Sequence, residues 1–319
     1  MNYYDYIFIG SSISNLLAAT CVKNKNILII EKDIYIGGAW RTSCDYYKNI
    51  DLVGHLIVPT NNTEGNKIIE HFRGIDLSLN YINKKDFLFE TENYRTNNKQ
   101  GVPIIATHGW TDFYNKIVTF VKKFNNIKII TNTEIIKITY EKKYVSLLSK
   151  KRLFICGKLV IPMYCNIDKI HYNTQIIEIP SKQITNTHVL LDISFCERLK
   201  ITKYFQAFLD QNPIGVFDRV TVSKLNTNNC LLSCRLSKHY KDVENIENLF
   251  LPFLKKKQIL NNSCEITNIY YFNYKCSYRN QTDRNTILDT CNGLTNICIL
   301  NTVYMGHFLE DFINNKLNF

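Results

Sequence analysis

The 319-residue sequence contains little proline and glycine and has no run of about 18 apolar residues that could cross a membrane. Its 6 prolines and 12 glycines form no flexible linker. Domains joined end to end usually need such a linker, so we expect any second domain to be inserted into the first. The N-terminal residues lead almost directly into an apolar segment that contains Asp5. We therefore expect no signal peptide and a cytoplasmic protein.

The sequence also lacks the residue patterns of several common catalytic and metal sites. No P-loop, zinc-ligand or Ser/His/Asp pattern is present, and the 11 cysteines follow no metal-binding spacing. Cys230 and Cys234 are four positions apart in an apolar run, which is not a zinc signature. We expect reduced, mostly buried thiols and no metal site.

Acidic residues are fewer than basic ones, 28 against 39, and the formal net charge is +11. Such an excess is compatible with an anionic partner, such as nucleic acid, a membrane or a phosphorylated ligand. The lysines are scattered, however, and the basic runs 150–152 and 255–257 are too short to form a binding arm. We attribute the charge to a general abundance of lysine and expect no nucleic-acid partner.

A strand–helix–strand unit opens the sequence. The apolar run 4–10 ends in Gly10, residues 13–23 have helical apolar spacing, and residues 26–30 form a second apolar run. Glu31 follows at once, 21 positions after Gly10. A carboxylate at this place can accept both ribose hydroxyls of an adenosine. The unit therefore predicts a parallel α/β sheet with a dinucleotide site.

The glycine motif of such a unit, G-x-G-x-x-G, is incomplete here. Gly10 remains, but Ser12 stands at the second glycine position and Asn15 at the third. Gly10 permits the tight turn, and the following helix N-terminus attracts a pyrophosphate. Ser12 is small, and its hydroxyl can cap the helix or donate to the phosphate. The third glycine allows close packing of helix on strand, so we expect Asn15 to cost about 1–3 kcal/mol unless the backbone moves.

Two adjacent glycines follow Glu31 and let the backbone pass close to a cofactor. The segments DYIFIGSSISNLLAA and ILIIEKDIYIGGAWRT resemble the start of the FAD-dependent amine oxidase and protoporphyrinogen oxidase superfamily, which includes UDP-galactopyranose mutase. Later segments resemble this family in the same order: IDLVGH at 50–55, PIIATHGW at 103–110, IKIITNTEIIKI at 127–138 and ICILNTVYMGHFLEDF at 297–312.

The resemblance implies an α/β fold, in which a Rossmann-like FAD-binding domain of the GR2 type carries an inserted α+β substrate or cap domain. We expect the discontinuous FAD-binding domain to comprise residues 1–75, 125–185 and 276–319. The cap domain then comprises 76–124 and 186–275, with a helix near residues 243–257.

The resemblance also implies which residues bind the cofactor FAD. They are Gly10, Ser11, Ser12, Ile13, Glu31, Lys32, Gly37, Gly38, Ala39, Trp40, Arg41, Ile135 and Gly306. Adenosine is expected at Glu31 and the backbone of Ile135, and pyrophosphate at the Gly10 turn. The flavin ring is expected near Arg41, and Gly306 opens a helix whose N-terminus faces its pyrimidine. Asn301 and Thr302 replace a G-D or G-R pair of the family.

His55 and Arg219 are the candidate catalytic residues. Beside a flavin, a histidine tunes the chemistry or binds substrate, and a hydrogen-bonded core histidine is the alternative. Arg219 resembles a cap-strand arginine of the mutase-like branch, whose role is an anion contact with the substrate. A salt bridge to a neighbour is the alternative. For Arg41, a contact with phosphate or substrate and a surface position remain equally open.

Two functions follow from the resemblance. One is an FAD-dependent oxidoreductase that acts on a small molecule, either amine oxidase-like or a redox-neutral nucleotide-sugar mutase. The other is a non-catalytic binding module on a degenerate FAD scaffold, as in Rab GDP-dissociation inhibitors. Asn15 and Asn301 favour the module, whereas Glu31 and the GGAWRT loop favour FAD. No second nucleotide fingerprint for NAD(P)H is present.

Overall fold

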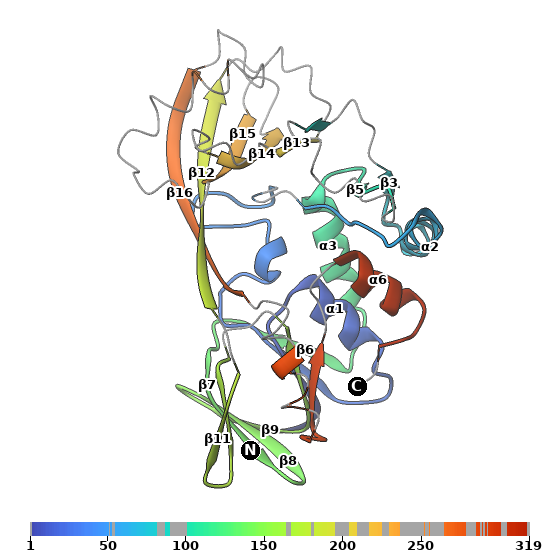
Figure 1. The fold of residues 1–319 in the computed structure, drawn as a ribbon, viewed down its shortest axis with the longest axis vertical. Coiled ribbons are helices and arrows are strands. Elements are labelled where there is room, and N and C mark those ends of the chain that lie inside the picture. The colour runs from blue at the N-terminus through green and yellow to red at the C-terminus, as the bar shows by residue number, and fades with distance from the viewer. Residues whose placement is uncertain are drawn as a thin grey trace.

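A computed structural model of the protein shows a mixed α/β architecture built on two sheets (Figure 1). It describes residues 2–50, 52, 55–81, 87–89, 101–163, 167–179, 182–194, 204–208, 217–224, 230–236, 252, 255, 265–278, 285–287, 289, 291, 293–300 and 305–317. Within these residues the first sheet has 9 strands in the order β11-β10-β7-β8-β9-β1-β2-β6, with β17 paired to β9. The second sheet has 6 strands in the order β16-β12-β15-β14-β13-β4.

The strands of the first sheet are β1 (Asn2–Ile9), β2 (Ile27–Ile30), β6 (Ile127–Ile130), β7 (Ile135–Glu141), β8 (Tyr144–Ser149), β9 (Leu153–Pro162), β10 (Lys169–Tyr172), β11 (Gln175–Glu178) and β17 (Ile297–Leu300). Those of the second are β4 (Phe87–Phe89), β12 (Lys182–Ser194), β13 (Tyr204–Phe208), β14 (Phe217–Lys224), β15 (Cys230–Leu236) and β16 (Glu265–Tyr278). A small pair is formed by β3 (Leu79–Tyr81) and β5 (Ile104–Ala106). The helices are α1 (Ile13–Thr20), η1 (Gly38–Trp40), α2 (Asn62–Arg73), α3 (Trp110–Val121) and α6 (Met305–Ile313).

The centre of the first sheet is parallel. Strand β1 pairs in parallel with β2 and β9, β2 with β6, and β9 with β17. All residues of β2 are buried, as expected of a strand covered on both faces. Because successive side chains alternate, Ile27 and Ile29 join one apolar core while Leu28 and Ile30 join another. The strand–helix–strand unit predicted from the sequence is confirmed.

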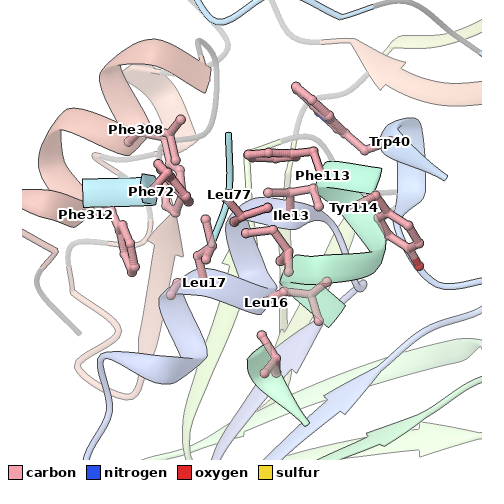
Figure 2. Close-up of a cluster of buried hydrophobic side chains, with 14 of the residues drawn as sticks. Ile13, Leu16, Leu17, Trp40, Phe72, Leu77, Phe113, Tyr114, Phe308 and Phe312 are labelled. Carbon is pink, nitrogen blue, oxygen red and sulfur yellow. The ribbon is translucent and has the colours of Figure 1, made fainter. Parts of the chain in front are cut away.

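Helices cover one face of this sheet. Figure 2 shows Leu17 of α1, Phe113 of α3 and Phe308 of α6 in the same apolar cluster. Helix α1 is buried on all sides from Ile13 to Ala19, because it lies between the sheet and the other helices. Helix α3 lies within the range assigned to the cap, yet it packs against α1 in this core.

The opposite face of the sheet is covered by its own antiparallel extension. Strands β7 and β8 pair antiparallel, and β8 pairs antiparallel with β9. Their inward side chains, such as Ile138 and Val145, pack on Ile7 and Leu28 from the parallel centre. The first sheet therefore has a separate apolar core on each face.

The second sheet is dominated by the long antiparallel pair β12 and β16, seen as two adjacent ribbons in Figure 1. The described strands of this sheet come from residues 87–89 and 182–278, while β5 to β11 lie between them in the sequence. The domain boundaries remain a prediction. The helix expected at 243–257 lies outside the described residues, except for helical positions 252 and 255.

Three of the described cysteines, Cys21, Cys44 and Cys156, are free thiols. Burial raises the pKa of the Cys156 thiol to about 12, so this thiol is protonated and unreactive at neutral pH.

In the part of the chain that the structure describes, every helix is too short or too polar to span a lipid bilayer.

Helix α6 is held tightly against the segment that precedes α2. Thr60 donates two hydrogen bonds to the Glu310 carboxylate, from its N at 2.7 Å and from its Oγ1 at 2.9 Å. One turn earlier, a Cβ on Gly306 would overlap the carbonyl oxygen of Val58. This close contact by itself requires glycine at position 306. The requirement does not depend on whether the N-terminus of α6 faces a flavin.

We expect Gly306→Ala to lower the free energy of unfolding by about 1–3 kcal/mol, because backbone must move to admit the methyl group. Urea denaturation measures the change. Gly293→Ala is the matched control, since a Cβ there meets nothing within 4 Å. Equal stability of the two variants would show that Gly306 does not lie this close to the backbone of Val58.

Candidate functional site

The turn between β1 and α1 has the conformation that a phosphate-binding turn needs. Gly10 has a φ of +82°, which side-chain-bearing residues rarely adopt, and a Cβ on it would meet nothing within 4 Å. Ser12 is the N-cap of α1, since its Oγ accepts the N–H of Asn15 at 3.3 Å. Gly10 and Ser12 are half-buried, whereas the side chain of Ile13 is buried in the core. The accessible side of the turn is therefore formed by Gly10 and Ser12.

Asn15, at the third glycine position, lies between α1 and the end of β1. Its side chain is fully buried, and Nδ2 donates to the carbonyl oxygens of Ile9 at 2.6 Å and Gly10 at 2.8 Å. The amide thus ties the helix to the turn through two hydrogen bonds, which stabilise this arrangement. The packing cost expected from the sequence stays a prediction. The Oδ1 of Asn15 is buried and has no hydrogen-bond partner among the described residues.

Glu31 is buried at the end of β2 with only 4% of its surface exposed. Its Oε2 accepts two hydrogen bonds from Ser11, from N at 2.9 Å and from Oγ at 2.6 Å. Its Oε1 accepts the N–H of Asp33 at 3.0 Å. The carboxylate that the sequence assigned to a ribose is therefore also a structural link between two loops.

The paired-glycine loop lies directly on the β1–α1 turn. The N–H of Gly37 donates to the Oγ of Ser11 at 2.9 Å, and Ser12 and Gly37 form a parallel bridge. Gly37 has a φ of +112°, and a Cβ on it would lie 2.7 Å from Cε2 of Tyr114. Gly38 has a φ of +56° and lies beside Ser12. The structure thus brings Ser11, Ser12, Glu31 and both glycines together.

Tyr114 is a site residue that sequence reasoning missed. Burial, and to a smaller extent the charge of Glu31, raises the pKa of its hydroxyl above the ordinary value. Its only sequence signal is a position on the apolar face of α3, which predicts burial but no particular neighbour. Its ring closes one side of the loop at Gly37.

Both tryptophans of the chain, Trp40 of the loop and Trp110 of α3, lie near His55. The rings of Trp40 and His55 stack with centroids 3.9 Å apart and planes 11° apart. Trp110 meets Trp40 edge-on at a centroid distance of 4.9 Å. Figure 2 shows Trp40 at the edge of the core cluster, on the same side as Tyr114. His55 therefore lies beside the paired-glycine loop.

The other predicted residues differ in how closely they join this cluster. Arg41 forms an ion pair with Asp33, with 3.5 Å between Nη1 and Oδ2, and its guanidinium lies over the Tyr35 ring. Lys32 is exposed. The chain just before Ile135 runs beside Glu31, since the N–H of Thr133 donates to the Glu31 carbonyl at 2.9 Å.

Several predicted positions lie outside the described residues. They are Asp51, Val53, Gly54, Asn301 and Thr302, together with the side chains of Ala39 and Arg219. The backbone of Arg219 lies in β14, opposite Phe208 of β13.

A second polar cluster joins the loop after Trp40 to the second sheet. Tyr47 packs edge-on against Tyr270 of β16, and burial and then the nearby Asp192 carboxylate of β12 raise the pKa of Tyr47. The Tyr47 hydroxyl and the Oδ1 of Asp192 are both buried. No motif in the sequence marks these residues. Their proximity depends on how the loop packs on the second sheet.

Among the described residues, no group of three or more His, Cys, Asp or Glu side chains is arranged to hold a metal ion.

The topology and the turn together define a Rossmann-like fold, in which a sheet with a parallel centre carries a glycine turn before the first helix. No protein-family model matches the sequence. No curated protein matches it either.

Solved structures match the fold at low sequence identity. A putative protoporphyrinogen oxidase from Exiguobacterium sp. 255-15 matches with a TM-score of 0.63 and 11% identity, over 97% of this chain and 96% of that chain. The p-nitrophenol 4-monooxygenase PnpA from Pseudomonas putida DLL-E4 matches with a TM-score of 0.54 and 11% identity, over 100% of this chain and 82% of that chain. NikD, an unusual amino acid oxidase essential for nikkomycin biosynthesis, matches with a TM-score of 0.51 and 10% identity, over 100% of this chain and 95% of that chain.

We expect Asn15→Gly, which restores the third glycine, to lower the free energy of unfolding by about 1–3 kcal/mol. Two buried hydrogen bonds are lost and a glycine enters a helix. Urea denaturation measures the change, and increased stability would show that Asn15 is a packing defect.

Asn15→Asp is expected to be more destabilising, because its carboxylate would face the carbonyl oxygens of Ile9 and Gly10. Burial raises the pKa of such a carboxyl in the folded state above its unfolded value. The carboxyl therefore holds its proton more strongly in the folded state than in the unfolded state. The stability deficit of the variant should shrink as the pH falls and grow as the pH rises through the folded-state pKa. Unfolding curves at several pH values test this, and a deficit independent of pH would contradict it.

Proposed function

We propose that this protein binds FAD and is an oxidoreductase that acts on a small molecule. The observation that carries the proposal is the convergence of Gly10, Ser12, Glu31 and Gly37 at the carboxyl ends of β1 and β2. Ligands of open parallel sheets bind at this edge. The named oxidases and monooxygenase among the matching folds support the same class.

The residues present fit such a cofactor. Space is open beside Gly10, where a Cβ would meet nothing within 4 Å, so a phosphate can approach the backbone. The N-terminus of α1 adds a partial positive charge there. Glu31 keeps acceptor capacity beyond the three hydrogen bonds that it receives. Ser12, which replaces a glycine, caps α1 and remains half-buried at the turn.

The roles of individual residues follow from their places. Gly10, Ser12 and the start of α1 would hold the pyrophosphate, and Glu31 with the backbone near Ile135 would hold the adenosine. Trp40 and His55 would lie on the flavin side, with Arg41 nearby. When bound, FAD supplies the capacity to accept a hydride from a C–N, C–C or C–O bond.

His55 is the proposed catalytic group that this chain supplies. Its imidazole is oriented by the stack on Trp40, and Trp110 packs edge-on behind that stack. Histidine is the side chain whose ordinary charge change lies closest to neutral pH, which suits it to proton transfer. The two indoles exclude water from one side of the imidazole. Arg219 of β14 is proposed as an anion contact for the substrate. Two of the similar folds are named as oxidases, which favours an oxidase over a redox-neutral mutase.

We expect the purified protein to show a flavin absorption spectrum or to take up added FAD. The chain has only 2 tryptophans, and both lie in the proposed site, so bound FAD should quench much of their fluorescence. A colourless protein that takes up no FAD would contradict the proposal and favour the non-catalytic binding module.

We expect Glu31→Gln to weaken FAD binding at least about tenfold, because the carboxylate that accepts ribose is lost. FMN lacks the adenosine, so the ratio of FAD to FMN affinity should fall. Glu178→Gln, on the exposed strand β11, is the matched control. Titration calorimetry measures both ligands, and an unchanged ratio in Glu31→Gln would refute the adenosine assignment.

A further inference from the structure

The hydroxyl of Ser11 occupies an unusual position at this site. The residue is fully buried, although it lies in the turn that is expected to meet the cofactor. Its Oγ donates to Oε2 of Glu31 at 2.6 Å and accepts the N–H of Gly37 at 2.9 Å. One hydroxyl group therefore uses its only proton on the carboxylate and a lone pair on the paired-glycine loop.

Three segments that are distant in the sequence meet at this hydroxyl. They are the β1–α1 turn, the end of β2 at Glu31 and the loop that begins at Gly37. The backbone N–H of Ser11 also donates to Oε2 at 2.9 Å, and that contact does not depend on the side chain. An alanine at position 11 would keep the backbone contact but lose both contacts of the hydroxyl.

The hydrogen bonds at Glu31 also limit what the carboxylate can still accept. A carboxylate offers about four acceptor positions, two on each oxygen. Ser11 occupies both positions of Oε2, and the N–H of Asp33 occupies one position of Oε1. Among the described residues, this leaves one acceptor position, on Oε1.

We propose that Ser11 is the positioning residue of the adenosine site, and that it restricts Glu31 to one of the two ribose hydroxyls. The hydroxyl orients the carboxylate, withdraws Oε2 from the ligand and holds the Gly37 loop in place. This inference rests on the proposed binding of FAD and concerns how the same site reads the ribose.

The restriction is tested with two FAD analogues, each lacking one of the adenosine ribose hydroxyls. With the wild-type protein, we expect one analogue to bind about tenfold more weakly than FAD and the other to bind within about twofold of it. Equal weakening by both deletions, or weakening by neither, would overturn the restriction. A wild-type protein that binds no FAD would instead overturn the proposed function, and the inference with it.

The positioning role is tested with Ser11→Ala, for which we expect FAD binding about tenfold weaker than wild type. Thr20→Ala is the matched control, because Thr20 lies at the opposite end of α1 and its hydroxyl donates to the carbonyl oxygen of Leu17 at 2.7 Å and not to Glu31. Its FAD affinity should stay within about twofold of wild type. Wild-type affinity in Ser11→Ala would overturn the role.

A double-mutant cycle separates positioning from a general structural effect. In the Glu31→Gln background, Ser11→Ala should weaken FAD binding no further, because the carboxylate on which it acts is absent. If the two substitutions weaken binding additively, Ser11 acts on the fold and not through Glu31. Circular dichroism of each variant shows whether it is folded, and the affinity ratios are compared among folded variants.

Discussion

A buried carboxylate must be hydrogen-bonded, and in this protein that requirement organises the site. Glu31 is almost completely removed from water, so its charge has to be met by N–H and O–H groups of the chain. Ser11 and Asp33 supply them, and Ser11 in turn binds the N–H of Gly37. These hydrogen bonds therefore hold the turn, the end of β2 and the paired-glycine loop in one relative arrangement.

The same arrangement accommodates the incomplete glycine motif. Each glycine of G-x-G-x-x-G serves a separate physical need. Of the three positions, only the first has a positive φ in this protein, and it has kept its glycine, Gly10. At the second position Ser12 caps the helix. At the third position Asn15 replaces close packing with two hydrogen bonds to the turn. Loss of two glycines is therefore compatible with an ordered turn.

Periodicity predicted the first strand–helix–strand unit well. Strands β1 and β2 and helix α1 begin within two residues of the expected positions, because each has a clear apolar pattern. The partner of each apolar face was harder to predict. Helix α3 has a strong apolar face, but its pattern does not say that this face packs on α1. The hydrogen bonds of Asn15 were missed for a related reason, since volume alone does not show that an amide finds two carbonyl acceptors.

By itself, the sequence determined which residue types stand at the ends of the first two strands: a glycine, a carboxylate and a pair of glycines. These suffice to predict the parallel unit and the place of a ligand, because they act through local backbone geometry and strand polarity. Only the tertiary structure decided what those residues do to one another. The link from Ser11 to Glu31 and Gly37, the stack of His55 on Trp40 and the approach of Tyr47 to Asp192 join residues far apart in the chain. Such contacts depend on how loops and sheets pack, and no local pattern encodes that packing.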